Sequence, residues 1–293
     1  MGSELWSVTT LVDATSTRGA ASLPWLWNAE PVICVLLATV GVIYLAGIAR
    51  LKGEQRVPTA ALSRGLAFAA GIVLLVVALL SPLDAWSDEI FSAHMAQHLI
   101  LMMLAPPLLI LGHPIVVALW ALPHDRRRAV AGWWQRSRVV RPIFDWIRGP
   151  LVAWLAASGA LWFWHLPKPY GLAFTDPIAH ALEHLSFFLT SILFWRVVIE
   201  HPQSRRLALG GTMIFVVTFA MENAMLAAIL IFASKVLYPV HLAAPAWSSL
   251  TPIEDQQLAG VLMWSVTGIV DLVALVWLFV AWLASSDRRT QRA

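Results

Sequence analysis

The most prominent pattern along the chain is a series of long apolar stretches separated by short segments that carry most of the charged residues. A helix needs about 20 predominantly apolar residues to cross the roughly 30 Å hydrocarbon core of a bilayer. We therefore predict an all-α polytopic membrane protein, a bundle of seven transmembrane helices within residues 31–283. The seven stretches are residues 31–49, 65–82, 91–112, 150–166, 177–199, 208–233 and 256–283.

Composition supports this class and excludes a soluble domain. Of the 293 residues, 59% are hydrophobic and only 13% are charged, and the mean hydropathy is +0.72. No soluble domain needs so large an apolar fraction. Residues 1–30 lack a basic start followed by an apolar block, so the sequence does not predict a cleavable signal peptide there.

The charges predict the orientation, because short loops rich in Lys and Arg stay on the cytoplasmic side. Of the 20 Lys and Arg, only Arg18, Lys168 and Lys235 fall outside one alternate set of loops and the tail. We expect residues 1–30 to form an extracytoplasmic N-terminal segment. Residues 124–149 then form an Arg-rich cytoplasmic loop, and 284–293 a basic cytoplasmic tail. The net charge of +3 reflects this topology and contact with the lipid bilayer, and we expect no nucleic-acid partner.

The third stretch raises a separate problem of length. Residues 91–123 would extend roughly 50 Å as one helix, and Pro106, Pro107, Gly112 and Pro114 interrupt them. Two crossings would put the Arg-rich loop outside. We therefore predict one kinked span followed by an interfacial segment at 114–123.

Two histidine pairs stand out within these stretches. His94 and His98 lie in the third, and His180 and His184 lie in the fifth, each pair with i,i+4 spacing. Residues four apart share a helix face, so both rings of a pair can aim at one point. The predicted topology puts both pairs in the outer leaflet, where an unpaired imidazole costs several kcal/mol. This pattern predicts a metal or haem site.

Other polar residues at the same level are secondary candidates. A lone histidine near a helix end more often bonds a neighbour or reaches the headgroups, and this applies to His165 and His241. Asp255 and Gln256 begin the seventh stretch and would orient the rings. The secondary candidates in or next to the fourth, fifth and seventh stretches are His165, Glu183, Asp255 and Gln256.

The sixth stretch holds a further group, Met221, Glu222 and Met225. Thioethers suit copper(I), although methionines in apolar helices more often serve packing. Glu222 is either a ligand or relay, or a partner in an interhelical hydrogen bond with Asn223 or Asp271. The single cysteine excludes an internal disulfide and a paired-cysteine metal motif, so the expected ligands are mainly nitrogen and oxygen.

Three motifs carry a resemblance to a known family. These are His94-Met95-Ala96-Gln97-His98, with the proline-rich sequence after it, then His180-Ala181-Leu182-Glu183-His184 and Asp255-Gln256-Gln257-Leu258-Ala259-Gly260. Together they resemble the caa(3)-type cytochrome c oxidase assembly factor family (CtaG, Bacillus type). The resemblance implies a multi-pass protein of the bacterial cytoplasmic (inner) membrane. It also implies cytochrome c oxidase subunits as partners and copper handling on the outer side. A site that faces outward could exchange copper with an extracytoplasmic copper donor.

Four interpretations follow from these residues. The first is an assembly factor that holds a copper ion through His94, His98, His180 and His184. The second is a membrane protein with haem b between one histidine of each pair. The third is a zinc-dependent intramembrane hydrolase, since the fifth-span motif has the order H-x-x-E-H. The fourth is a metal-free scaffold. We favour the first and expect no enzymatic activity, but spacing alone does not show whether the third and fifth spans are neighbours.

Overall fold

The computed structural model describes residues 27–54, 61–199, 207–242 and 248–290. Every regular element in these ranges is a helix, which confirms the predicted all-α class. Residues 1–26 of the predicted N-terminal segment and 291–293 of the predicted tail lie outside the described ranges.

Six of the helices are long and apolar enough to cross a membrane. They match the predicted spans except the fourth, which forms the shorter apolar helix α10, Pro150–Trp164, of 15 residues. At about 1.5 Å per residue, α10 is roughly 22 Å long. The six are α2 (Pro31–Gly53), α3 (Ala61–Leu80), the combined helix Phe91–Leu111, α12 (Pro177–Ile199), α13 (Leu209–Phe232) and the apolar part of α14 (Pro252–Thr290).

The combined helix is interrupted, as the prolines predict. It consists of α5 (Phe91–Leu99), a π-helical turn η1 (Ile100–Leu104) and α6 (Ala105–Leu111). Pro106 has no N–H to donate to the carbonyl of Met102 four residues earlier. The indole Nε1 of Trp195 on α12 donates to that carbonyl instead, at 2.9 Å. The interruption therefore anchors this span to α12.

A sharp turn separates α6 from the next helix. His113 adopts a left-handed conformation with φ 51° and precedes α7 (Pro114–Ala121). The predicted separate segment after the kinked span is therefore present as a helix of its own.

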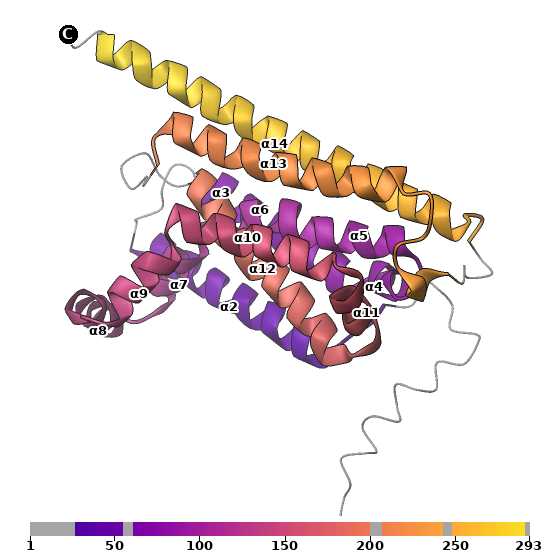
Figure 1. Cartoon of the computed structure of the whole chain (residues 1–293). Helices are drawn as coiled ribbons and strands as arrows, with labels where there is room; N and C mark the ends of the chain where they lie inside the picture. The colour runs from indigo at the N-terminus through magenta and orange to yellow at the C-terminus, as the bar shows by residue number, and fades with distance from the viewer. Residues whose placement is uncertain (1–26, 55–60, 200–206, 243–247, 291–293) are drawn as a thin grey trace, which may run out of the picture.

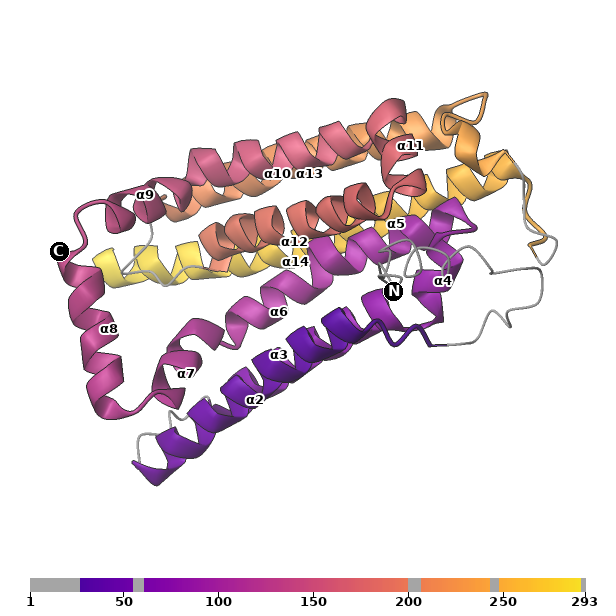
Figure 2. The same ribbon diagram turned by 90° about the horizontal axis from the view of Figure 1, so that it is seen from below.

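The two ends of the bundle are capped by different short helices. The predicted Arg-rich loop folds into α8 (His124–Arg136) and α9 (Val140–Ile147). Figures 1 and 2 place both at the end of the bundle where α14 finishes. At the opposite end lie α4 (Pro82–Ser87) and α11 (Pro167–Thr175). The 3-10 turn η2 (Pro239–His241) joins α11 through a hydrogen bond between Tyr170 and His241.

Candidate metal site

Both histidine pairs face one shared cluster. It lies between α5 and α12, near the end of the bundle that α4 and α11 cover (Figure 2). His94 and His98 come from α5, one turn apart, with ring centroids 4.2 Å apart. His180 and His184 come from α12, with their Nε2 atoms 3.1 Å apart. The third and fifth spans are therefore neighbours at this point, which the spacing of the residues alone does not reveal.

The two pairs meet ring to ring. The rings of His94 and His180 are stacked, with centroids 5.8 Å apart and an interplanar angle of 21°. The centroid of the His98 ring lies 5.3 Å from that of His184. These separations are short enough for all four imidazoles to share one small volume.

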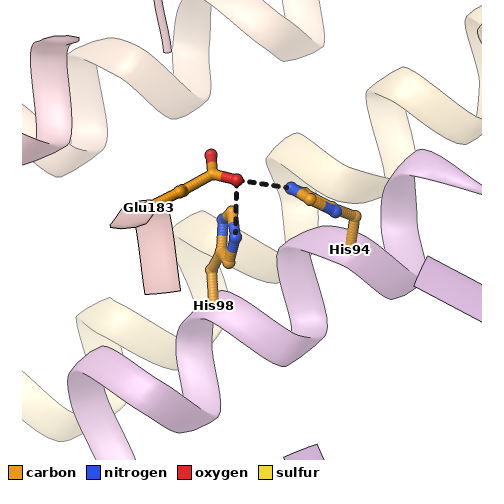
Figure 3. A group of neighbouring side chains, drawn as sticks. All are labelled: His94, His98 and Glu183. Carbon is orange, nitrogen blue, oxygen red and sulfur yellow. Dashed lines mark ion pairs between the residues drawn. The ribbon is translucent and has the colours of Figure 1, made fainter. Parts of the chain in front are cut away.

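Glu183 lies at the centre of this cluster. Its Oε2 is 3.7 Å from Nε2 of His94 and 3.8 Å from Nε2 of His98 (Figure 3). It also forms a compact group with His180 and His184, and in each group the ligand atoms lie within 4.8 Å of one another. The sequence places Glu183 among the secondary candidates, whereas in the structure this carboxylate links both pairs. Its i,i+3 spacing from His180 is the signal that predicts a shared face.

Burial makes this arrangement costly without a ligand. Glu183, His94 and His98 are 1%, 2% and 3% exposed, while His180 and His184 are only partly buried. Nε2 of His94, both ring nitrogens of His98 and Oε2 of Glu183 are buried without a hydrogen-bond partner. Such groups cost several kcal/mol each in an apolar environment.

The spacing of these atoms suits an ion between them. Two nitrogen or oxygen ligands at about 2.0–2.1 Å from one tetrahedral ion lie roughly 3.4 Å apart. The observed 3.7 and 3.8 Å from Glu183 to the two histidines are close to that value. A metal ion would also satisfy the atoms that lack hydrogen bonds, so the donor set fits a bound metal.

Asp255 has a different part in the site from the one the sequence suggests. Its carboxylate accepts hydrogen bonds from the backbone N–H groups of Phe91 and Ser92, at 2.7 and 3.0 Å. These are the first N–H groups of α5, which have no partner within the helix. Asp255 therefore fixes the start of the helix that carries His94 and His98, and its bonds do not orient the rings.

Gln256 likewise bonds backbone rather than imidazole. Its Oε1 accepts from the N–H of Leu237 at 2.7 Å, and its Nε2 donates to the carbonyl of Leu230 at 3.3 Å. It therefore ties α14 to the end of α13. The predicted ring-orienting role does not match these bonds, because they join the side chain to backbone groups at the end of α13 and just after it.

Gln97, between the two histidines of α5, anchors an adjacent face of that helix. Its Nε2 donates to the carbonyl of Ala78 at 2.7 Å and to Oδ1 of Asp84 at 2.9 Å. Asp84 on α4 in turn accepts from the side chain of Asn28. This chain of bonds holds α5 against α3 and α4, so the histidine face of α5 points toward α12.

An aromatic layer covers the end of the cluster nearest α11. The ring of Tyr170 on α11 lies 5.3 Å from that of His94, and its hydroxyl lies 2.6 Å from Nε2 of His241. Burial, with a smaller contribution from His94, lowers the pKa of His241 to about 4. The imidazole is therefore neutral at pH 7, and the Tyr170 hydroxyl donates to it. His241 has the structural role that the sequence favours for a lone histidine.

His165 approaches the cluster without joining either group of possible metal ligands. Its Nδ1 bonds the carbonyl of Leu161 at 2.7 Å, while its Nε2 is buried without a hydrogen-bond partner. The carbonyl of His165 accepts from the hydroxyl of Tyr238 at 2.9 Å. Its ring lines a small cavity together with His98.

The group predicted in the sixth stretch does not reach the cluster. Met221 and Met225 are 67% and 53% exposed on α13, so their thioethers face the surroundings of the bundle. Oε2 of Glu222 is buried without a hydrogen-bond partner, and Asn223 donates to the carbonyl of Phe219 instead. The structure therefore shows no hydrogen bond of Glu222 with Asn223 or Asp271. Met221 and Met225 share a face of α13, as their spacing predicts, but that face is exposed and does not turn toward the cluster.

Comparison with known proteins identifies the family. The model of the cytochrome c oxidase caa3 assembly factor family (Caa3_CtaG) matches residues 42–285. The chain belongs to this family. The match includes every residue of the cluster and confirms the resemblance that the three motifs carry. Oxidase assembly is thus the process with which the Caa3_CtaG fold is associated.

Individual relatives add little about chemistry. Uncharacterised proteins of Mycobacterium bovis and Mycobacterium tuberculosis are each 26% identical over 270 residues, and one of Mycobacterium leprae is 26% identical over 277 residues. Each alignment covers 90% of this chain, and the chain spans about 40% of the length of these relatives. No solved structure matches the chain.

Proposed function

We propose that the chain binds a copper ion at the histidine–glutamate cluster and passes it to a cytochrome c oxidase during assembly. The observation that carries this proposal is the convergence of buried nitrogen and oxygen atoms that lack hydrogen bonds on His94, His98 and Glu183. Membership of an oxidase assembly family supplies the process. A non-catalytic role follows, in which the ion is cargo.

The donor set supports copper, because imidazole binds copper ions well. The two pairs also differ in access, since His180 and His184 are partly exposed while His94 and His98 are buried. An ion can therefore enter through the α12 pair and be held by the α5 pair, with Glu183 in contact with both. A cargo site needs such a route for exchange.

The other interpretations fit the geometry less well. A haem between the pairs would need a slot for the porphyrin, yet Glu183 lies within 4 Å of both histidines of α5. A hydrolase needs room for a substrate, and the cavity beside His98 is only about 10 Å³. A metal-free scaffold would leave the buried polar atoms uncompensated.

We further propose a seven-span topology in the bacterial cytoplasmic membrane, with α10 as the seventh crossing. The Arg-rich helix α8 and the far end of α14 lie at one end of the bundle, opposite the cluster (Figure 2). The positive-inside rule then makes that end cytoplasmic, so the N-terminus is extracytoplasmic. The cluster faces outward, where oxidase subunits and an extracytoplasmic copper donor would have access to it.

Copper content is the test of this function. Full-length protein purified in detergent and loaded with copper is compared with the double variant His94→Ala/His98→Ala. The control is His124→Ala, since that exposed histidine on α8 pairs only with Asp125, at 3.5 Å. We expect one or more copper ions per chain in the wild type and the control, and loss of most of this copper in the double variant.

Three outcomes would contradict the proposal. A Soret band in the purified protein would indicate haem, and retained zinc with turnover of a peptide or lipid would indicate a hydrolase. Absence of any bound metal after loading would favour the interpretation as a metal-free scaffold. A parallel test in cells measures the copper content of the oxidase, which should fall when the double variant replaces the wild type.

A further inference from the structure

Four buried methionines surround a small cavity next to the histidine–glutamate cluster. None of the four is more than 5% exposed. Three come from the interrupted span, and the fourth comes from α14. The cavity of about 10 Å³ also borders on two histidines; these six lining residues are Met95, Met102, Met103, Met263, His98 and His165.

The two histidines that line this cavity carry nitrogen atoms without hydrogen-bond partners. Both ring nitrogens of His98 and Nε2 of His165 are buried without a hydrogen-bond partner. His165 is oriented by the bond from its Nδ1 to the carbonyl of Leu161. Buried imidazole nitrogens of this kind need a partner. The other two polar side chains that line the cavity, Asn223 and Thr267, donate instead to backbone carbonyls of their own helices.

The position of these methionines depends on the interruption in the span. Met102 and Met103 lie in the π-helical turn η1, and such turns occur frequently at functional sites. Trp195 fixes the turn through its bond to the carbonyl of Met102. The exposed Met221 and Met225 on α13 lack any such arrangement.

The chemistry of the cavity differs from that of the cluster beside it. Thioether sulfur is a soft ligand that selects Cu(I), whereas the cluster presents imidazole and carboxylate. The cavity is close to the smallest volume that holds one water molecule, about 10–15 Å³. It therefore has room for a single ion and excludes a larger ligand.

We propose that this cavity is a second copper position, specific for Cu(I), and that His98 links it to the histidine–glutamate cluster. Its two to four ligands would be drawn from the sulfur atoms of Met95, Met102, Met103 and Met263 and the nitrogen atoms of His98 and His165. The proposal rests on the proposed copper-binding function and adds a position deeper in the bundle. Transfer between the two positions is an exchange of ligands around Cu(I), without a change in oxidation state.

The test is X-ray absorption spectroscopy of the full-length wild-type protein loaded with Cu(I) under reducing conditions. We expect sulfur scattering in addition to nitrogen. The double variant Met95→Leu/Met263→Leu should weaken this sulfur signal and bind Cu(I) at least tenfold more weakly in competition with a chelator. The matched control, Met221→Leu/Met225→Leu, removes two exposed thioethers and should keep both properties.

The outcomes separate the two proposals. Copper bound by nitrogen and oxygen alone in the wild type would overturn the Cu(I) position while the proposed function stands. Absence of any bound copper would overturn both. Sulfur scattering unchanged in Met95→Leu/Met263→Leu would also overturn the Cu(I) position. The wild-type spectrum decides the question even if that variant fails to fold, which size-exclusion chromatography in detergent checks.

Discussion

The span that carries the first histidine pair, Phe91–Leu111, and the first span, Pro31–Gly53, are both long and apolar but have opposite surroundings. In their most apolar stretches, 61% of the residues of the former are buried inside the protein and only 11% of the latter. The more buried stretch is also the less apolar one, with a mean hydropathy of 1.6 against 2.6. Length and apolarity therefore predict that a helix crosses the membrane, but not whether protein or lipid surrounds it.

Polar groups explain how the central span is held. Asp255 bonds its first N–H groups, Gln97 ties it to α3 and α4, and Trp195 bonds its interrupted middle. The first span has fewer such bonds: Tyr44 donates to the carbonyl of Gly112 at 3.0 Å. A second contact is steric, where Gly47 lies against α7. The comparison predicts that polar anchors matter most in the central span and close packing matters in the outer one.

The largest effect is expected from Asp255→Ala. The substitution leaves two buried N–H groups at the start of α5 without partners, at about 1–3 kcal/mol each, so we expect a loss of about 4 kcal/mol of stability. Thermal unfolding in detergent measures this loss, and copper retention should fall with it because His94 lies one turn away. The control is Glu254→Ala, whose carboxylate accepts hydrogen bonds from the backbone N–H and the hydroxyl of exposed Thr251, directly before the same helix. Equal unfolding temperatures for the two variants would refute the anchoring role of Asp255.

A smaller effect is expected from Gly47→Ala in the first span. A Cβ at Gly47 would lie 2.1 Å from the carbonyl oxygen of Val117, which is backbone and cannot rotate away. Separation of α2 from α7 should cost about 3 kcal/mol, at the upper end of overpacking. Gly41→Ala in the same helix meets nothing within 4 Å and should be neutral or stabilising by up to about 1 kcal/mol. Similar unfolding temperatures for the two alanine variants would show that α2 does not depend on this contact.

The sequence predicts the helices of this fold better than it predicts which helices lie side by side. Apolar length predicts seven spans, and six of them are helices of spanning length in the described residues. Pro106 with Pro107 predicts the interruption of the third, because each of these signals acts within one helix. The same holds for the i,i+4 histidine pairs, whose shared faces are a property of the helix itself.

Relations between helices are not predictable in this way. The contact of α5 with α12, the central place of Glu183 and the capping of α5 by Asp255 join residues far apart in the sequence. The methionines show the same limit: Met221 and Met225 have helical spacing yet face outward, while Met95 and Met263 meet across two helices. Only the packing of helices decides which face of an apolar helix becomes the inner one.

The smallest of the three effects depends on pH. It concerns His241, in the aromatic layer that covers the cluster at the start of the central span. The ring of His241 lies 5.3 Å from that of Phe91, the first residue of α5. The pKa of His241 is about 4 in the folded protein, against 6.5 as its ordinary value, so the unfolded chain binds a proton first as the pH falls. The contribution of a neutral His241 is full above pH 6.5 and is lost progressively toward pH 4, by about 2 kcal/mol at pH 5.

The variant His241→Gln isolates this contribution from that of the other histidines. Glutamine cannot be protonated in this range, and its carbonyl oxygen can still accept from the Tyr170 hydroxyl. Unfolding temperatures measured between pH 7 and pH 5 should therefore fall less steeply in the variant than in the wild type. Parallel pH profiles would mean that His241 does not change its protonation on unfolding. The aromatic layer over α5 would then be stabilised by the packing of its rings. The first span, α2, has a contact of the same kind: Tyr44 stacks on Phe68 of α3, with ring centroids 3.7 Å apart.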